Sequence, residues 1–306
     1  MALAEWRPPD LTATECIGAQ RPLSFAALLD QEAGPTAHGD PLPPLWHWLY
    51  FLDWPRQSDL GPDGHPLSGG FLPPIPNRRR MFAGGRVTFR CPLRYGDVVT
   101  RRSRLLRCET KEGRSGTLHF VTVEHRLDRD GRELLVEEQD LVYRSAVEPA
   151  APPALQAGDA GFPERDSPWQ LRFRLDPVAL FRFSALTGNA HRIHYDLPYA
   201  RDVEGFPGLV VHGPLLALLL MEAVRRCGPP RAVASFRFRA ARPVFAGEPI
   251  LVHGAAAGTA GAHLLVEGGG SPSRMTADVE FGAPAGDVGE GQAESESFLA
   301  RIDDEA

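Results

Sequence analysis

The chain has 306 residues and a formal net charge of −6, and 43% of its residues are hydrophobic and 24% charged. Its length and composition suit a globular protein of one large domain or two units of roughly 100 to 150 residues each. The negative charge argues against nucleic-acid binding, and the longest apolar run, Leu215–Met221, is far below the roughly 18 residues that cross a membrane. Because no basic and apolar leader opens the chain, we expect a cytoplasmic protein without nucleic-acid or membrane partners.

The first half begins with an apolar segment, PLWHWLYFL, which predicts a buried helix over residues 44–52 because proline suits the first helical turn. A Gly- and Pro-rich stretch, residues 53–85, follows and is expected to form a pocket wall. Alternating polar and apolar residues then predict strands that begin at Val87, Val98, Leu118 and Leu141. Residues 146–168, rich in Pro and Ala, are expected to connect this half to the next.

The second half repeats this order. An apolar segment that opens with Pro214 and ends in Arg225 and Arg226 predicts a second buried helix over residues 214–226. Strands are again predicted after the helix, beginning at Ala234, Ile250, Ala262 and Met275. Residues 284–306, rich in Gly, Glu and Ala, are expected to form a disordered acidic tail.

A bend between predicted strands supports an internal repeat. The segment 92–97, PLRYGD, recurs as 243–248, PVFAGE. We therefore expect an α+β fold with the pattern of a double hotdog, in which two antiparallel sheets are each wrapped around a long central helix. The predicted units are an N-terminal hotdog over residues 1–145 and a C-terminal hotdog over residues 169–283.

The segment 181–196, FRFSALTGNAHRIHYD, places several hydrogen-bonding side chains in a short apolar setting. It resembles the active-site segment of the MaoC-like hydratases and dehydratases. In that family an aspartate after Thr-Gly or Ser-Gly is followed, with four residues between, by a histidine. Asn189 stands at the place of the aspartate, and His194 keeps the place of the histidine. The resemblance implies a hydro-lyase whose second half is catalytic, because the first half has no such segment.

Longer segments are similar to the branch of this family that contains mesaconyl-C4-CoA hydratase and itaconyl-CoA hydratase. These segments are LWHWLYFL within 42–52, LGPDGHP at 60–66, RRMFAGGR at 79–86 and GFPGLVVHGP at 205–214. The same branch is similar to fungal 3-hydroxyacyl-thioester dehydratases of type 2. The resemblance implies reversible hydration of a short branched dicarboxylic α,β-unsaturated acyl-CoA, with citramalyl-CoA as the product.

Hydration of a double bond conjugated to a thioester needs a group that deprotonates water and donors for the charge that collects on the carbonyl oxygen. His194 is the candidate acid–base group, since a histidine exchanges protons near neutral pH. Asn189 can hold water through its amide but cannot take a proton. This favours a one-base mechanism; help from His191 or Asp196, and a weakened enzyme, are the alternatives.

The turn at His212 and Gly213 precedes the second predicted helix, where unpaired N–H groups can face a substrate carbonyl as an oxyanion hole. A plain helix cap is the alternative. His191, His212 and Tyr195 are expected to bind substrate. The histidines could instead bind a metal, but the sequence offers no firm third ligand, so we expect neither a metal nor a cofactor.

Four arginines, Arg78, Arg79, Arg80 and Arg86, lie at the end of the Gly- and Pro-rich stretch. Guanidinium groups bind carboxylate or phosphate at two points, so these residues are expected to bind the free carboxylate of a dicarboxylic acyl group or the phosphates of CoA. A solvated basic turn is the alternative.

Two other functions stay open at this point. One is a 3-hydroxyacyl-thioester dehydratase of fatty-acid metabolism, and the other is a non-catalytic acyl-CoA binding protein. In each case the expected partner is an acyl-CoA. A monomer and a homodimer both fit, because paired hotdogs supply within one chain what single hotdogs obtain by dimerising.

Overall fold

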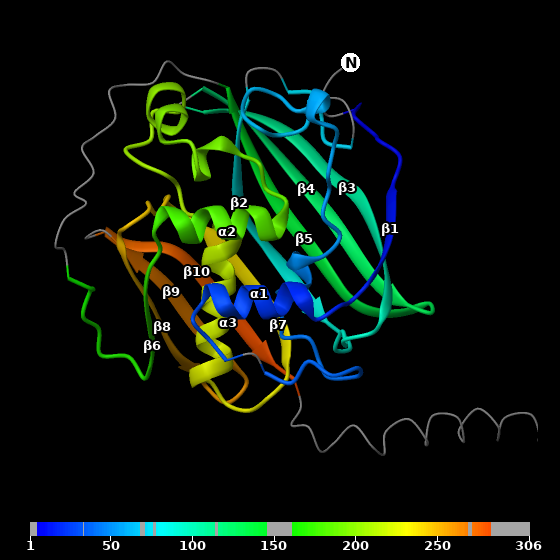
Figure 1. Cartoon of the computed structure of the whole chain (residues 1–306), viewed down its shortest axis with the longest axis vertical. Coiled ribbons are helices and arrows are strands. Elements are labelled where there is room, and N and C mark those ends of the chain that lie inside the picture. The colour runs from blue at the N-terminus through cyan, green and yellow to red at the C-terminus, as the bar shows by residue number, and fades with distance from the viewer. Residues whose placement is uncertain are drawn as a thin grey trace, which may run out of the picture.

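The computed structural model describes residues 5–32, 34–67, 71–75, 78–113, 116–145, 161–268 and 271–282 (Figure 1). Most of the predicted connector, residues 146–160, and the predicted tail, 284–306, lie outside the described residues. The strands are β1 (Leu11–Cys16), β2 (Arg78–Phe89), β3 (Val98–Gly113), β4 (Gly116–Arg129), β5 (Arg132–Ser145), β6 (Trp169–Arg174), β7 (Val233–Ala240), β8 (Pro249–Ala257), β9 (Gly261–Gly268) and β10 (Ser271–Phe281). The helices are α1 (Gln20–Leu28), α2 (Pro177–Thr187) and α3 (Gly213–Cys227), with short turns η2 (Trp46–Leu49), η3 (Gln57–Asp59), η4 (Arg192–His194) and η5 (Tyr199–Val203).

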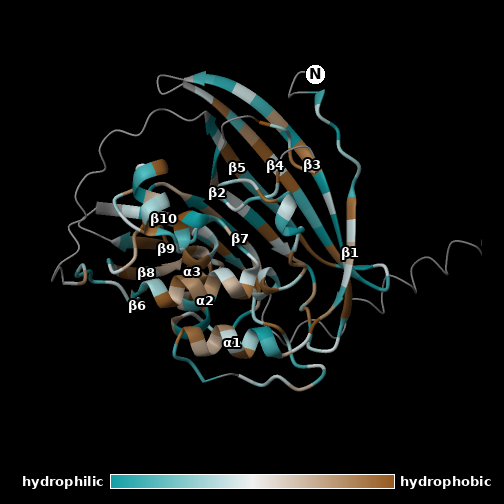
Figure 2. Ribbon diagram, turned by 45° about the horizontal axis from the view of Figure 1, so that its top comes forward, coloured by the Kyte–Doolittle hydropathy of each residue, from teal (hydrophilic) through white to brown (hydrophobic). Residues whose placement is uncertain are grey.

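The strands form one antiparallel sheet in the order β1-β3-β4-β5-β2-β7-β10-β9-β8-β6. This order is symmetric about the β2–β7 pair, so each half contributes five strands in corresponding positions. All eight predicted strands begin within strands of this sheet. Bands of hydrophobic and hydrophilic residues alternate along β3, β4 and β5 (Figure 2), as expected where only one face is covered.

The recurring bend confirms the internal repeat. Gly96 and Gly247 both adopt left-handed backbone, with φ of +91° and +83°. Their N–H groups donate to the carbonyls of Ile17 and Leu175, which follow β1 and β6. The two halves therefore share both the sequence motif and its hydrogen bond to the residue that follows the first strand of each half.

The two predicted sheets are joined edge to edge into one, which refines the double-hotdog prediction. The register of β2 against β7 runs from Gly84 opposite Arg239 to Thr88 opposite Ser235. A Cβ atom on Gly84 would lie 2.5 Å from the carbonyl oxygen of Phe238, so this close approach requires glycine. Gly84 of the motif RRMFAGGR is thus needed for the pairing of β2 with β7.

The predicted second helix is confirmed as α3, and Figure 1 shows it enclosed by the strands of the second half. Every residue from 215 to 224 is buried, including Glu222, which pairs with Arg225 and Arg226 at the helix end. Pro214 lies in the first turn, as predicted. None of the helices in the described ranges has both the length and the apolar character of a membrane span.

The prediction of a long helix over residues 44–52 is wrong. Only the short turn η2 forms there, and Leu45 and Phe51 on either side of it adopt left-handed backbone. The indole of Trp46 donates to Glu222 of α3, whereas His47 and Trp48 both bond to the carboxylate of Glu137 on β5. In a helix the side chains of adjacent residues point about 100° apart, so His47 and Trp48 could not both reach Glu137. Their hydrogen bonds to this carboxylate therefore favour the irregular turn.

Two helices that the sequence analysis did not assign, α1 and α2, lie side by side in corresponding places of the two halves (Figure 1). The carboxylate of Asp176 caps α2 by accepting from the N–H of Ala179, and Pro177 follows the cap. Gly188 ends the helix in left-handed backbone. The helix therefore ends at Thr187, two residues before Asn189, and Gly188 turns the chain into the segment that carries His194.

Candidate active site

A cavity of about 900 Å³ lies between the two halves. Its walls come from the start of α3, from the segment after α2, and from β2, β5 and the loop residues of the first half. Asn189, His191, His194 and Gly213 all line it, as do Arg79 and Arg80, so the structure brings together six of the predicted site residues. His65, Phe71 and Leu72 also line it, which confirms that the Gly- and Pro-rich stretch is a pocket wall.

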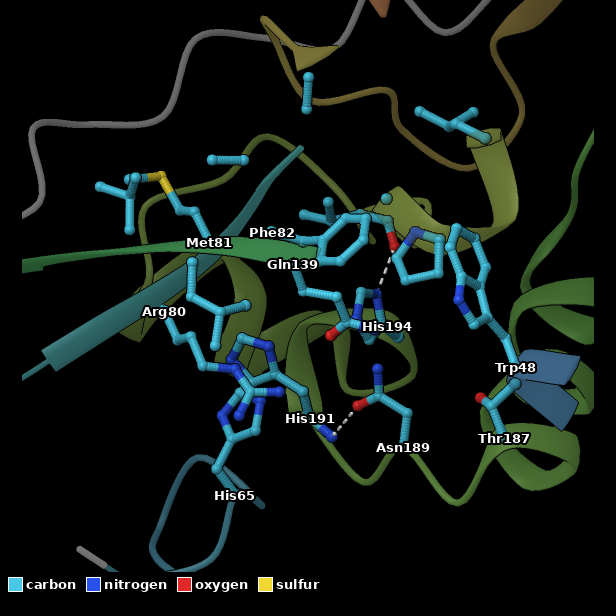
Figure 3. Close-up of a pocket in the computed structure, with 18 of the residues that line it drawn as sticks. Trp48, His65, Arg80, Met81, Phe82, Gln139, Thr187, Asn189, His191 and His194 are labelled. Atoms are coloured by element: carbon cyan, nitrogen blue, oxygen red, sulfur yellow. Dashed lines mark hydrogen bonds between the residues drawn. The ribbon is translucent and has the colours of Figure 1, made fainter. Parts of the chain in front are cut away.

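The imidazole of His194 is oriented by a backbone carbonyl. It lies at the end of η4 and is buried, and its Nδ1 lies 2.7 Å from the carbonyl oxygen of Val210 (Figure 3). Nδ1 is therefore the donor, and Nε2 is left as an acceptor. Burial lowers the pKa of His194 to about 4, against the opposing effect of the Val210 bond. At neutral pH this side chain is an uncharged base at the cavity wall.

The amide of Asn189 lines the same cavity as this base. Its Oδ1 accepts a hydrogen bond from the N–H of His191 at 3.0 Å, and its nitrogen points toward His194 in Figure 3. Asn189 therefore presents a donor to the cavity. A donor can hold the oxygen of a water molecule next to the His194 imidazole, but it cannot accept a proton.

His212 does not line the cavity, contrary to the expected substrate contact. It is completely buried behind His194, and its Nε2 is hydrogen-bonded to the hydroxyl of Ser184 at 2.9 Å. Burial, followed by the charges of His194 and His191, lowers the pKa of His212 well below its usual value. The His212 ring stacks on the His194 ring and supports it from behind.

Gly213 opens α3 at the cavity wall, where the first N–H groups of a helix have no partner within the helix. A Cβ atom at this position would lie 3.0 Å from the ring of Phe82. The absence of a side chain thus lets the Phe82 ring pack against the helix N-terminus. This geometry fits the predicted oxyanion hole.

The predicted arginines have different surroundings. Arg80 lines the cavity, and its guanidinium makes no hydrogen bond or ion pair with any described residue. Arg79 pairs with Glu204 at 3.1 Å. Arg86 does not line the cavity; it pairs with Glu138 and Asp140 on the neighbouring strand β5. The side chain of Arg78 lies outside the described residues.

Two further candidates lie away from the cavity. Tyr195 is 45% exposed, and its hydroxyl donates to the carbonyl of Ala190. Asp196 is bound by the guanidinium of Arg192 at 2.7 Å and caps the N–H of Tyr199. Of the alternatives for a second proton-transfer group in the segment 181–196, only His191 therefore reaches the cavity.

The sequence analysis missed the side chains of Asp63 and His65 as site residues. His65 is buried at the cavity wall, its ring centroid lies 4.2 Å from that of His191, and its Nδ1 lies 3.0 Å from Asp63 Oδ2. Burial alone would raise the pKa of Asp63, but the hydrogen bonds and charge of His65 lower it to about 2. Side-chain atoms of Asp63, His65 and His191 all lie within 4.8 Å of one another.

A second polar group that sequence reasoning missed comes from β5. Glu137 is buried at the cavity wall and accepts hydrogen bonds from Trp48 and Gln139, and His47 Nε2 lies 3.0 Å from it. Burial opposes ionisation of Glu137, but the bond and charge of His47 lower its pKa to about 2. The second half has the central helix α3. The first half instead contributes polar side chains to the cavity wall.

Comparison with known proteins agrees with this geometry. Over 223 residues the chain is 49% identical to the mesaconyl-C(4)-CoA hydratase of Chloroflexus aurantiacus, which covers 73% of this chain and 78% of the relative. It is 28% identical over 239 residues to the mitochondrial hydroxyacyl-thioester dehydratase type 2 of Schizosaccharomyces pombe, covering 69% of this chain and 77% of that one.

Two solved structures share the fold. HtdX of Mycobacterium tuberculosis matches 89% of this chain and 99% of its own with a TM-score of 0.59 and 19% identity. A MaoC-like dehydratase from Phytophthora capsici matches 92% and 96% with a TM-score of 0.62 and 16% identity. The sequence profile of the hydroxyacyl-thioester dehydratases of type 2 matches residues 45–246, which include η2, the loop of His65, and the whole segment from α2 into α3. The chain belongs to this family of hydro-lyases.

Proposed function

We propose that the protein reversibly hydrates a short branched dicarboxylic enoyl-CoA, mesaconyl-C4-CoA or itaconyl-CoA, to citramalyl-CoA. The observation that carries the chemistry is the placement of His194 beside Asn189, with the imidazole Nδ1 bound to Val210. The substrate class is supported by the 49% identity to the hydratase of Chloroflexus. The guanidinium of Arg80 lies at the cavity wall without a partner among the described residues, and this supports an acyl group with a free carboxylate.

In the hydration direction, Asn189 holds the attacking water through its amide nitrogen. His194 Nε2 takes one proton of that water as its oxygen bonds to the β-carbon of the acyl group. The negative charge moves to the thioester oxygen, where the N–H groups at Gly213 stabilise it. A proton then bonds to the α-carbon. In the one-base form expected from the sequence, protonated His194 returns that proton.

The proposed reaction uses no metal and no redox cofactor. Addition of water to an activated double bond changes no oxidation state overall, so no redox cofactor is needed. We propose that the enzyme acts in the cytoplasm, and that its only small-molecule partner is the acyl-CoA. Both the monomer and the homodimer are compatible with the proposal.

The test is incubation with a panel of unsaturated acyl-CoAs, followed by product mass. We expect a gain of one water with mesaconyl-C4-CoA, and we expect His194→Ala to lose turnover by about 10²- to 10⁴-fold while CoA-ester binding persists. Full activity of His194→Ala would exclude the assigned base.

A second candidate is a 3-hydroxyacyl-thioester dehydratase acting on fatty-acyl chains, which the relative from Schizosaccharomyces supports. The two candidates differ in the charge of the acyl group. Comparison of kcat/KM for crotonyl-CoA and mesaconyl-C4-CoA separates them, because only the second substrate carries a free carboxylate. A preference for crotonyl-CoA and longer chains would support the dehydratase.

A further inference from the structure

The sheet of the first half is polar where it faces the cavity, whereas the sheet of the second half is apolar at the same positions. Val87 of β2 and Phe238 of β7 lie at the same distance before the recurring bend. Glu137 lies opposite Val87 in the sheet, and Ala277 lies opposite Phe238. Glu137 therefore has the place in the first half that Ala277 has in the second.

Strand pairing places four more polar residues of the first half where the second half has apolar residues or glycine. The corresponding pairs are Gln139 and Val279, His125 and Leu264, Ser103 and Gly254, and Arg101 and Val252. In the second half the strands that carry these positions pack against α3, and the apolar members belong to the hydrophobic core. In the first half Gln139, His125 and Arg101 line the cavity instead.

Hydrogen bonds to Glu137 orient the side chain of Gln139. Glu137 is only 2% exposed, and its carboxylate accepts from the indole of Trp48 at 2.8 Å and from Nε2 of Gln139 at 2.6 Å. Because an ionised carboxylate only accepts, the amide nitrogen of Gln139 is the atom bound to it, and Oε1 is left as an acceptor at the cavity. In Figure 3 the side chain of Gln139 extends from β5 toward His194.

Two more polar groups lie at the cavity on β4 and β3. His125 Nδ1 lies 2.7 Å from the hydroxyl of Ser103, and burial lowers the pKa of His125 to about 4, so it is uncharged at neutral pH. The guanidinium of Arg101 lies 5.2 Å from the ring centroid of Phe51, and its Nε is buried without a hydrogen-bond partner among the described residues. Water or a polar ligand can bond to such groups, but an alkyl chain cannot.

We propose that a polar wall, formed by Gln139, His125 and Arg101, restricts the enzyme to short acyl groups by excluding an alkyl chain beyond the β-carbon. This inference rests on the proposed hydration of an enoyl thioester and names residues that select its substrate class. A chain that continues past the β-carbon at His194 would meet Gln139 and desolvate the polar wall. The loss of polar partners then offsets the gain from burying CH2 groups. In mesaconyl-C4-CoA the β-carbon carries only a methyl group and a carboxylate, so this acyl group ends before the polar wall.

Binding of saturated acyl-CoAs tests the polar wall without turnover. In an apolar pocket each added CH2 group would raise the affinity about fourfold. From butyryl-CoA to octanoyl-CoA we expect the affinity of the full chain to rise by less than about fourfold in total. Isothermal titration calorimetry measures both Kd values. A gain of about 100-fold or more over this series would overturn the inference.

The internal repeat supplies the variants. Gln139→Val and His125→Leu introduce the residue types that the second half carries at the same positions. We expect the double variant to raise the ratio of kcat/KM for octenoyl-CoA to that for crotonyl-CoA about 10- to 100-fold over the wild-type ratio. An unchanged ratio in a double variant that melts near the wild-type temperature would overturn the inference.

Two further variants complete the comparison. Glu138→Gln is the matched control, because Glu138 lies next to Gln139 on β5 but pairs with Arg86 away from the cavity, and it should leave the ratio unchanged. If the double variant does not fold, the single variant Gln139→Val carries the same test, since it keeps the bond of Trp48 to Glu137.

Failure of the proposed function would look different. If the wild type hydrates no enoyl-CoA, the proposed function is wrong, and the calorimetry still tests the polar wall. If the wild type hydrates mesaconyl-C4-CoA but has a higher kcat/KM for octenoyl-CoA than for crotonyl-CoA, only the role of the polar wall is wrong. A wild type that prefers octenoyl-CoA and does not hydrate mesaconyl-C4-CoA would overturn both and support the fatty-acyl dehydratase.

Discussion

The imidazole rings of His194 and His212 are stacked, with centroids 3.6 Å apart and planes inclined by 18°. His212 belongs to the turn that starts α3, whereas His194 belongs to η4, so the stack couples the base to the proposed oxyanion hole. We expect His212→Leu to lower kcat about 10-fold and to destabilise the fold by about 1 to 3 kcal/mol, since it removes the ring support and leaves Ser184 without its buried partner. Steady-state kinetics and urea unfolding measure both. An unchanged kcat in a stable variant would argue against a supporting role of His212 for His194.

Arg80 and Arg86 form a matched pair for testing recognition of the acyl carboxylate. Both lie on β2, but Arg80 faces the cavity without a partner among the described residues, whereas Arg86 is neutralised by Glu138 and Asp140. We expect Arg80→Gln to lower kcat/KM for mesaconyl-C4-CoA about 10- to 100-fold, the size of a charge-assisted hydrogen bond, and to leave that for crotonyl-CoA unchanged. Arg86→Gln should affect neither substrate. An equal loss on both substrates would indicate that Arg80 binds the CoA phosphates.

Gly64→Ala tests the close contact between the loop of His65 and the segment 181–196. The added methyl group would overlap the carbonyl of Ala190 on a backbone with positive φ, so the loop must move away. We expect a loss of stability of about 1 to 3 kcal/mol and a fall in activity, with increased hydrogen exchange at Arg192, whose N–H donates to Asp63. Gly131→Ala is the control, because it also has positive φ but meets no atom within 4 Å. Equal losses in both variants would attribute the effect to backbone strain alone.

The buried histidines make the stability of the fold depend on pH. Burial lowers the pKa of His194 to about 4 and that of His191 to about 2, whereas both titrate near 6.5 in the unfolded chain. The unfolded chain therefore takes up protons that the folded site excludes, and the free energy of unfolding falls as the pH falls from about 6.5 to about 4. For His194 alone the loss is on the order of 3 kcal/mol. Urea unfolding at several pH values measures it, and His191→Asn, which cannot ionise, should flatten the slope.

The sequence predicted most of the fold because its signals are local or repeated. The strands show alternation, α3 is apolar nearly all round, and the bend at Gly96 recurs at Gly247. The segment 44–52 misled because its apolar character matches a buried helix, and the bonds that decide its shape are made to Glu137 and Glu222, far along the chain. The residue pattern of the segment 44–52 itself carries no information about these two distant glutamates.

The candidate site was predictable in the segment 181–196 and much less so elsewhere. His194, Asn189 and Gly213 share the cavity, as the motif indicated. The loop of His65 was expected to be a pocket wall, but which of its side chains faces inward depends on how Gly64 packs against Ala190. The four arginines at 78–86 posed the same problem, because the direction of each side chain depends on tertiary packing. The sequence did not show that Arg80 faces the cavity whereas Arg86 pairs with residues of the neighbouring strand.

The pairing of β2 with β7 has a consequence for how the molecule folds. Each of these strands is the edge strand that its half alone would expose to solvent. In the whole chain the two strands cover each other along five residue pairs, from Gly84–Arg239 to Thr88–Ser235. Neither half expressed alone would keep its backbone groups satisfied, and an isolated half should aggregate through the bare strand. Loss of native structure on heating should accordingly occur in a single cooperative transition that both halves share.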